Sequence, residues 1–171
     1  MKIAVIIRYG LIAWLSLGSV NHAQAELADP TDFFVVYYQP TKANVLRVLD
    51  KMEVEFELDA DGDVDYVMND KGWRGYVVFQ SLGEHRQLWN IQLKAQFSTK
   101  AEYYNELVKI SNQWNSQQLM PKAAMKTPTK LVLSVNYPVQ YGFNPSEFKT
   151  NVFQLFNREV ERFAVLIEGK R

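Results

Sequence analysis

The acidic segment Asp59-Ala60-Asp61-Gly62-Asp63-Val64-Asp65 is the part of this sequence whose residue types and spacing come closest to a binding site. Alternating carboxylates supply the oxygen ligands that a hard cation such as calcium prefers. An EF-hand loop, however, needs glycine at its sixth position and glutamate at its twelfth, and starting the loop at either Glu57 or Asp59 fails to give both. The segment therefore predicts a hairpin turn with solvated acids, with weak calcium binding as the alternative. The candidate ligands are Asp59, Asp61, Asp63 and Asp65.

Histidine and cysteine, the residues that most often carry catalysis or bind metals, are scarce. The chain has no Cys and two His, which excludes disulfides, thiol catalysis and cysteine-based zinc sites. His22 falls within the N-terminal segment discussed below, and His85 lies in the polar stretch 83–86, where we expect an exposed turn. There is no Gly-x-Ser-x-Gly elbow and no phosphate-binding glycine-rich loop. We therefore predict a non-enzymatic protein without catalytic residues or cofactor.

A hydrolase of the cell envelope that uses paired carboxylates remains an alternative, because nothing in the sequence singles out a pair among the 19 acidic residues. Composition narrows the remaining classes. The chain has 171 residues, of which 47% are hydrophobic, and 19 basic residues balance the 19 acidic ones. This is the composition of a single globular domain. A neutral chain lacks the basic excess that nucleic-acid binding requires, so we expect no nucleic acid as a partner.

The first 25 residues have the three-part plan of a secretory signal peptide. Lys2 and Arg8 are basic, an apolar stretch covers residues 11–20, and Ala23-Gln24-Ala25 has the small-x-small pattern of a signal-peptidase site. The apolar stretch is shorter than the ~20 residues that a membrane-spanning helix needs. We therefore predict cleavage after Ala25, a periplasmic or secreted protein, and no stable membrane span after cleavage.

The elements that must position any site follow from the hydrophobic periodicity of residues 40–168, which we expect to form one domain after a lead-in segment of residues 26–39. Helices are predicted over 41–52, from a cap at Ser98-Thr99 to about 115, and from Asn144 to 167. Alternating residues predict strands over 54–58, 64–68, 73–81, 89–97, 119–126 and 131–137. The fold class is therefore α+β, an antiparallel meander sheet with helices packed on one face, in the order α-β-β-β-β-α-β-β-α.

One short motif carries a resemblance to a known family. The second predicted helix ends in Asn112-Gln113-Trp114-Asn115, after four strands that include an Asp-Gly hairpin. This pattern resembles the YbjN-domain family, and the strand ending in Leu93-Lys94-Ala95-Gln96-Phe97 is similar to that family's strand before the helix. The sequence departs from the family pattern at residues 117–121 and at the turn 127–129.

The resemblance implies a fold like that of type III secretion chaperones, a possible homodimer and no established enzymatic activity. The family is often described as a regulator of bacterial sensory transduction. We therefore expect an envelope protein that recognises an unidentified protein partner as a chaperone or adapter would. Asn112, Trp114 and Asn115 have a simple structural interpretation, in which the indole fills the helix–sheet interface and the amides bind the free carbonyls at the helix end.

Overall fold

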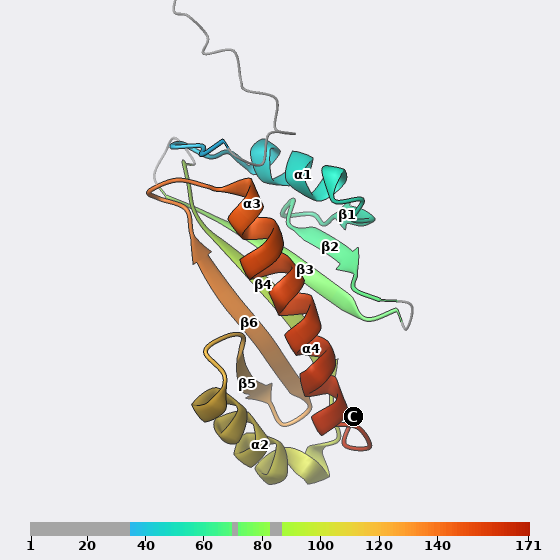
Figure 1. The fold of residues 1–171 in the computed structure, drawn as a ribbon. Coiled ribbons are helices and arrows are strands. Elements are labelled where there is room, and N and C mark those ends of the chain that lie inside the picture. Colours follow the sequence, from blue (N-terminus) through green and yellow to red (C-terminus); the bar gives the residue numbers. More distant parts are fainter. Residues whose placement is uncertain (1–34, 70–71, 83–86) are drawn as a thin grey trace, which may run out of the picture.

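The computed structural model describes residues 35–69, 72–82 and 87–171 (Figure 1). Helices and strands follow one another in the predicted order. The strands are β1 (Phe56–Leu58), β2 (Val64–Val67), β3 (Arg74–Leu82), β4 (Gln87–Ser98), β5 (Lys122–Thr127) and β6 (Lys130–Pro138). The helices are α1 (Lys42–Lys51), η1 (Ala101–Tyr103), α2 (Tyr104–Gln117), α3 (Pro145–Glu147), η2 (Phe148–Gln154) and α4 (Leu155–Leu166).

The six strands form one antiparallel sheet in the order β1-β2-β3-β4-β6-β5. Strands β1 to β4 make the predicted meander, since each pairs with the next along the chain. Helix α2 then separates β4 from the β5–β6 hairpin, and β6 rather than β5 adjoins β4. The α+β class and the order of elements are therefore confirmed.

The helices α1, α3 and α4 lie on one face of the sheet, and α2 lies on the same side at its end (Figure 1). Alternation in β4 explains this, because Ile91, Leu93, Ala95 and Phe97 are all buried against the helices. The last helical segment contributes Phe148, Phe156 and Phe163 to the same core. Burying a side chain of this size contributes about 1.5–3 kcal/mol, so this face supplies most of the stability.

Helix α1 agrees closely with the range predicted from the sequence. Thr41 caps the helix by accepting a hydrogen bond from the Asn44 N–H, and the Asn44 side chain accepts one in return from the Thr41 N–H. This reciprocal pairing satisfies two backbone donors that would otherwise lack partners. The buried side chains of Val45, Val48 and Leu49 then hold the helix on the sheet.

The last helix starts as predicted, with Asn144 accepting from the Glu147 N–H and Pro145 at the first position. It is not one uniform α-helix, because residues 148–154 form a wider π-helical turn. Two successive side chains in this turn, Val152 and Phe153, are both buried. The period-3.6 pattern did not reveal this turn, because the spacing of Phe148, Val152 and Phe156 also fits an ordinary α-helix.

Several boundaries differ from the predictions. Helix α2 was expected to start at a Ser98-Thr99 cap, but β4 runs to Ser98 and the N-cap of the following 3-10 turn is Lys100, which makes no side-chain capping bond. Strand β1 starts at Phe56, two residues later than expected, and β5 starts at Lys122 rather than at Leu119. The predicted turn around His85 lies outside the described residues.

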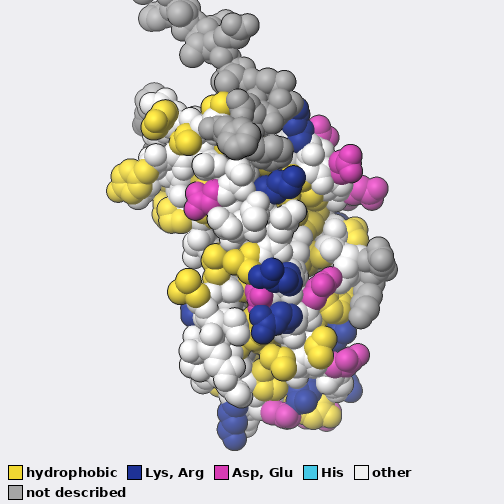
Figure 2. Space-filling model, in the orientation of Figure 1, with side chains coloured by type: hydrophobic (Ala, Val, Ile, Leu, Met, Phe, Trp, Pro, Cys, Tyr) yellow, Lys and Arg dark blue, Asp and Glu magenta, His cyan; other side chains and the backbone are white. Residues whose placement is uncertain are grey.

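The lead-in segment is anchored at its end, where Tyr37 and Phe143 exchange backbone hydrogen bonds of 2.9 and 2.8 Å. None of the described helices is both long and apolar enough to cross a membrane. Figure 2, which views the helix-bearing side, shows basic and acidic side chains interspersed over the surface rather than gathered into a single patch.

Candidate functional site

The acidic hairpin uses its carboxylates to hold its own backbone. Asp59 Oδ1 accepts from the N–H groups of Asp61 and Asp63, at 3.0 and 2.8 Å. Asp63 Oδ1 accepts from the Phe79 N–H at 2.9 Å, and Asp65 forms an ion pair with Arg74. These carboxylates therefore point to separate protein donors. Within residues 35–69, 72–82 and 87–171, no three His, Cys, Asp or Glu side chains gather as the ligands of a metal would.

The motif residues Trp114 and Asn115 hold helix α2 against β5. Trp114 is buried, and its Nε1–H donates to the Pro121 carbonyl at 2.8 Å. The Asn115 amide donates to the Ala123 carbonyl and accepts from the Ala123 N–H, both at 2.8 Å. Asn115 thus pairs with β5 as a neighbouring strand would.

These amides were predicted to bind the free carbonyls at the end of α2, and that prediction is wrong for Asn115. Lys122 takes this role, because its Nζ donates to the carbonyls of Asn115 and Gln118 at 3.0 and 2.7 Å. A cation at a helix C-terminus also interacts favourably with the helix dipole. Asn112 is exposed on the outer side of the helix.

One acidic side chain is buried among the described residues, and it is balanced by arginines. Glu159 in α4 is 4% exposed, and its carboxylate lies 2.6 Å from Arg162 and 3.4 Å from Arg158. A glycosidase-like hydrolase needs two facing carboxyl groups in a pocket. The printed contacts of the Glu159 carboxylate are to two arginines, and these ion pairs give it a structural role.

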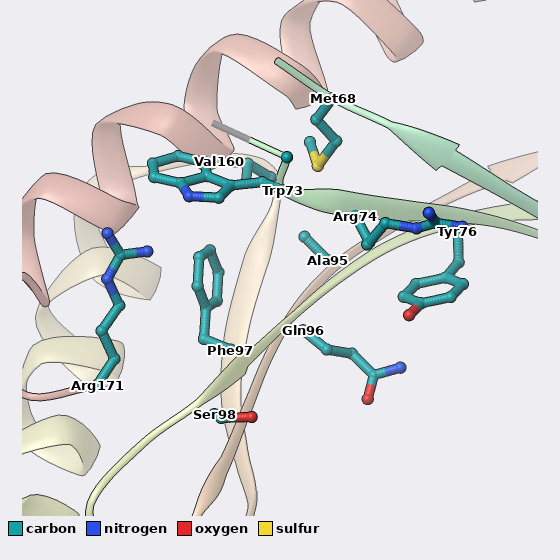
Figure 3. Close-up of a pocket in the computed structure, with 11 residues that line it drawn as sticks. Met68, Trp73, Arg74, Tyr76, Ala95, Gln96, Phe97, Ser98, Val160 and Arg171 are labelled. Carbon is teal, nitrogen blue, oxygen red and sulfur yellow. The ribbon is translucent and has the colours of Figure 1, made fainter. Parts of the chain in front are cut away.

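A cleft opens where strand β3 begins beside the end of β4 (Figure 3). The ladder between these strands ends at the pair Gly75 and Ala95, whereas β4 continues to Ser98. The cleft occupies about 630 Å³, which is within the usual size of a small-molecule or side-chain pocket. It is lined by Met68, Gly72, Trp73, Arg74, Tyr76, Ala95, Gln96, Phe97, Ser98, Val160 and Arg171.

Trp73 and Phe97 give the cleft its apolar surface on the helix side of the sheet, and Tyr76 lines it from the other face. The rings of Trp73 and Phe97 meet edge to face, with centroids 6.3 Å apart, and Tyr76 lies further along β3 (Figure 3). The hairpin that precedes β3 is closed by the Met68 N–H, which donates to the Trp73 carbonyl at 2.7 Å. This bond fixes the position from which the Trp73 ring projects under α4.

The C-terminal segment brings a cation to the cleft. The Lys100 N–H donates to the Lys170 carbonyl at 3.1 Å, and the guanidinium carbon of Arg171 lies 5.0 Å from the centre of the Trp73 ring. A cation at this distance from an indole makes a favourable cation–π contact.

Arg74 supplies the second cation, and its Nη2 lies 2.7 Å from Asp65 Oδ2. The hydrogen bond to Asp65 raises the pKa of Arg74 above its ordinary value, so the guanidinium stays charged. Among the residues that the structure describes, the lining contains two arginines and no acidic residue. Since Asp65 balances the charge of Arg74, Arg171 is the cation that can bind a negatively charged group of a ligand beside the apolar rings.

This cleft was not predicted from the sequence. Its residues come from the β2–β3 hairpin, the end of β4, α4 and the C-terminus, which are far apart in the chain. The signal that the sequence did contain was Trp73 next to a turn, and a lone aromatic at a turn does not by itself indicate a site. His85, the other residue considered for chemistry, lies outside the described residues.

Comparison with solved structures supports the fold. The crystal structure of YbjN from E. coli is similar to this chain with a TM-score of 0.62 and 16% sequence identity, and the match covers 75% of this chain and 91% of that chain. At this identity the likeness shows the fold and not a shared partner.

Sequence comparison identifies the family. None of the curated protein sequences matches this chain. A family model does match, over residues 41–167, and it is described as "YbjN: Putative bacterial sensory transduction regulator". That description is of a regulator and not of an enzyme. Since the matched region covers well over half of the sequence and the solved YbjN structure has the same fold, this chain belongs to the YbjN family.

Proposed function

We propose that this protein is an exported, non-enzymatic regulatory protein that binds a segment of a protein partner in the cleft beside β3 and β4. The observation that carries the proposal is the cleft lining, in which the rings of Trp73 and Phe97 lie beside Arg171 and, among the described residues, no acid is present. Apolar pockets with a few convergent polar groups are the usual form of a binding site. Membership of a family described as regulatory supports binding rather than catalysis.

The positive charge of the cleft lining indicates which kind of protein segment could bind there. Arg171 carries a guanidinium for which no ion pair is formed with the described acidic residues. A carboxylate next to an apolar side chain would satisfy both the cation and the rings. We therefore expect the partner to present an acidic and apolar segment, which would bind without leaving a buried charge unpaired.

Site-specific photocrosslinking in cells tests this function. A benzoylphenylalanine at position 96, on the cleft, is compared with one at position 141, in the loop before α3 at the other end of the sheet (Figure 1). Gln96 and Tyr141 are both exposed, so both probes are accessible. We expect one dominant protein adduct from position 96 that is absent from position 141. The Arg171→Glu change should weaken that adduct. Equal adducts from both positions would contradict cleft binding.

Export is tested separately by fractionation and mass spectrometry. The sequence of residues 1–25 supports the proposal of a cleaved signal peptide, with Glu26 as the first residue of the mature chain. We expect the protein in the periplasmic or extracellular fraction, with the mass of a chain that begins at Glu26. A cytoplasmic protein that retains Met1 would contradict export without bearing on the cleft.

A further inference from the structure

The last residues of β4 are paired on one side only. Towards β6, the pairing continues as far as Ser98, which lies opposite Lys130. Towards β3, the pairing ends at Ala95, which lies opposite Gly75. In the part of the chain that the structure describes, no strand pairs with this side of β4 after Ala95. The cleft lies along this unpaired edge, because Gln96 and Ser98 both line it (Figure 3).

The backbone groups of Ser98 face the cleft. Along a strand, the N–H and C=O of successive residues point alternately to the two neighbouring strands. The Thr99 N–H donates to the Thr129 carbonyl at 2.9 Å, on the β6 side. Ser98, one residue earlier, therefore directs its N–H and C=O to the opposite side, where the cleft lies. These are the groups with which an extended peptide pairs when it adds to the edge of a sheet.

The unpaired edge is short and is bounded at both ends. At one end, the start of β3 lies beside Ala95. At the other end, the Lys100 N–H, which points to the same side as that of Ser98, donates to the Lys170 carbonyl at 3.1 Å. The stretch between them, residues 96–99, is about 13 Å long at ~3.3 Å per residue. An internal segment of a partner would have to enter and leave within this length, whereas the end of a chain needs to enter only once.

The charge beside this edge favours one end of a chain over the other. The guanidinium of Arg171 points towards the Trp73 ring, 5.0 Å from its centre (Figure 3). A terminal amine would be repelled by this cation, whereas a terminal carboxylate can form a charge-assisted hydrogen bond with it. The Trp73 ring lies next to the same position and can contact an apolar side chain of the bound residues.

We propose that the cleft binds the free C-terminus of its protein partner as an extended strand that adds to β4. The backbone of the bound residues pairs with Ser98, and the terminal carboxylate binds Arg171. The added strand runs antiparallel to β4, because this direction brings its carboxyl end towards Trp73, where β3 starts and the Arg171 guanidinium lies. This mode of binding rests on the proposed function, and it specifies which part of the partner enters the cleft and how.

Mapping the photocrosslink from position 96 on the partner separates this proposal from the proposed function. The adduct formed in cells is digested, and mass spectrometry identifies the partner peptide that carries the crosslink. We expect the C-terminal peptide of the partner. An adduct that maps to an internal segment would overturn C-terminal binding and leave the proposed function intact. Absence of any adduct specific to position 96 would overturn both.

The role of the carboxylate is tested with two synthetic peptides that carry the C-terminal sequence of the captured partner. One peptide has a free carboxylate and the other a C-terminal amide, and fluorescence anisotropy measures their binding to the protein purified from cells. We expect the free acid to bind about tenfold more tightly or better. Arg171→Gln should abolish most of this difference, whereas Lys109→Gln, on the exposed side of α2, should preserve it. Equal binding of the two peptides to the wild-type protein, or an undiminished difference in Arg171→Gln, would overturn the proposal.

The strand pairing is tested at Ser98. Ser98→Pro removes the N–H that faces the cleft, and it spares the ladder with β6 because that N–H points away from β6. We expect about tenfold weaker binding of the free-acid peptide, with a thermal melt close to that of the wild-type protein. Ser98→Ala removes the hydroxyl but keeps the N–H, and it should bind the peptide as the wild-type protein does. Unchanged binding in a folded Ser98→Pro variant would overturn strand addition, and if that variant does not fold, the comparison in Arg171→Gln still decides.

Discussion

Replacing Asn115 with aspartate separates the strand-like role of this side chain from a general effect on helix α2. Aspartate keeps an oxygen that accepts from the Ala123 N–H, but it loses the N–H that donates to the Ala123 carbonyl at 2.8 Å. It also places a negative oxygen next to that carbonyl. An intramolecular hydrogen bond contributes about 1 kcal/mol, and a buried group left without a partner costs about 1–3 kcal/mol. We expect Asn115→Asp to lower the free energy of unfolding by about 2 kcal/mol at pH 7.

The loss should depend on pH with a defined sign. When the introduced carboxyl group is protonated, its O–H can donate to the Ala123 carbonyl, so folding favours the protonated form of the new side chain. The pKa of that carboxyl is therefore raised above its ordinary value of about 3.9 in the folded state. Its stabilising contribution is present at low pH and is lost as the pH rises through the folded-state pKa. The difference from wild type should thus shrink between pH 7 and pH 4.

Urea unfolding at pH 7 and pH 4, followed by circular dichroism, measures both effects. The matched control is Asn112→Asp, which introduces the same charge three residues earlier at an exposed position. At pH 7, a loss of about 2 kcal/mol corresponds to a midpoint about 4–8 °C lower in a thermal melt. If the two variants lose equal stability, or if the loss at position 115 grows as the pH falls, then Asn115 does not act as a strand partner.

Three further predictions concern the core and its surroundings. Gly75→Ala should cost about 1–3 kcal/mol by thermal melting, because an added Cβ would overlap the Tyr66 ring, and an unchanged midpoint would contradict this contact. Burial, with Glu147 nearby, raises the pKa of Tyr137 to about 12, so stability should fall as the pH rises from about 10 towards 12. Ultraviolet titration of Tyr137→Phe, compared with wild type, should show the loss of one late-titrating phenol. Thr41→Ala should cost about 1 kcal/mol in urea unfolding through the lost N-cap, whereas Thr41→Ser should cost much less.

The elements that were predicted best are those in which local patterns and tertiary contacts agree. The alternation of β4 from Trp89 to Phe97 places Leu93 and its neighbours on the helix side, as observed. The Asn144-Pro145 start of the last helix was predicted from capping residues alone and has the expected hydrogen bond. In both cases the residues that form the sequence pattern also make the contacts that stabilise the strand or helix. A short stretch of sequence is therefore enough to predict the element.

The elements that were predicted least well depend on contacts between distant residues. The start of β5 is set by Pro121, whose carbonyl is held by Trp114, so residues 119–121 turn towards α2 instead of entering the sheet. The cleft depends on how far β4 extends beyond the β3 ladder and on the C-terminal segment beside Lys100. The hydrophobic pattern of the sequence shows neither how far β4 extends beyond β3 nor that the C-terminal segment lies beside Lys100. Both depend on contacts between residues that are far apart in the chain.

The pairing of Asn115 with Ala123 also bears on aggregation. An outer strand with free N–H and C=O groups can recruit a strand from another molecule, and repeated addition leads to fibrils. At one outer strand of this sheet, β5, the Asn115 amide occupies the groups of Ala123 that an incoming strand would use. At the other, β1 is three residues long and is flanked by Glu55 and Asp59. Both features oppose the addition of a further strand, and a variant that frees Ala123 would expose its backbone groups at the β5 edge.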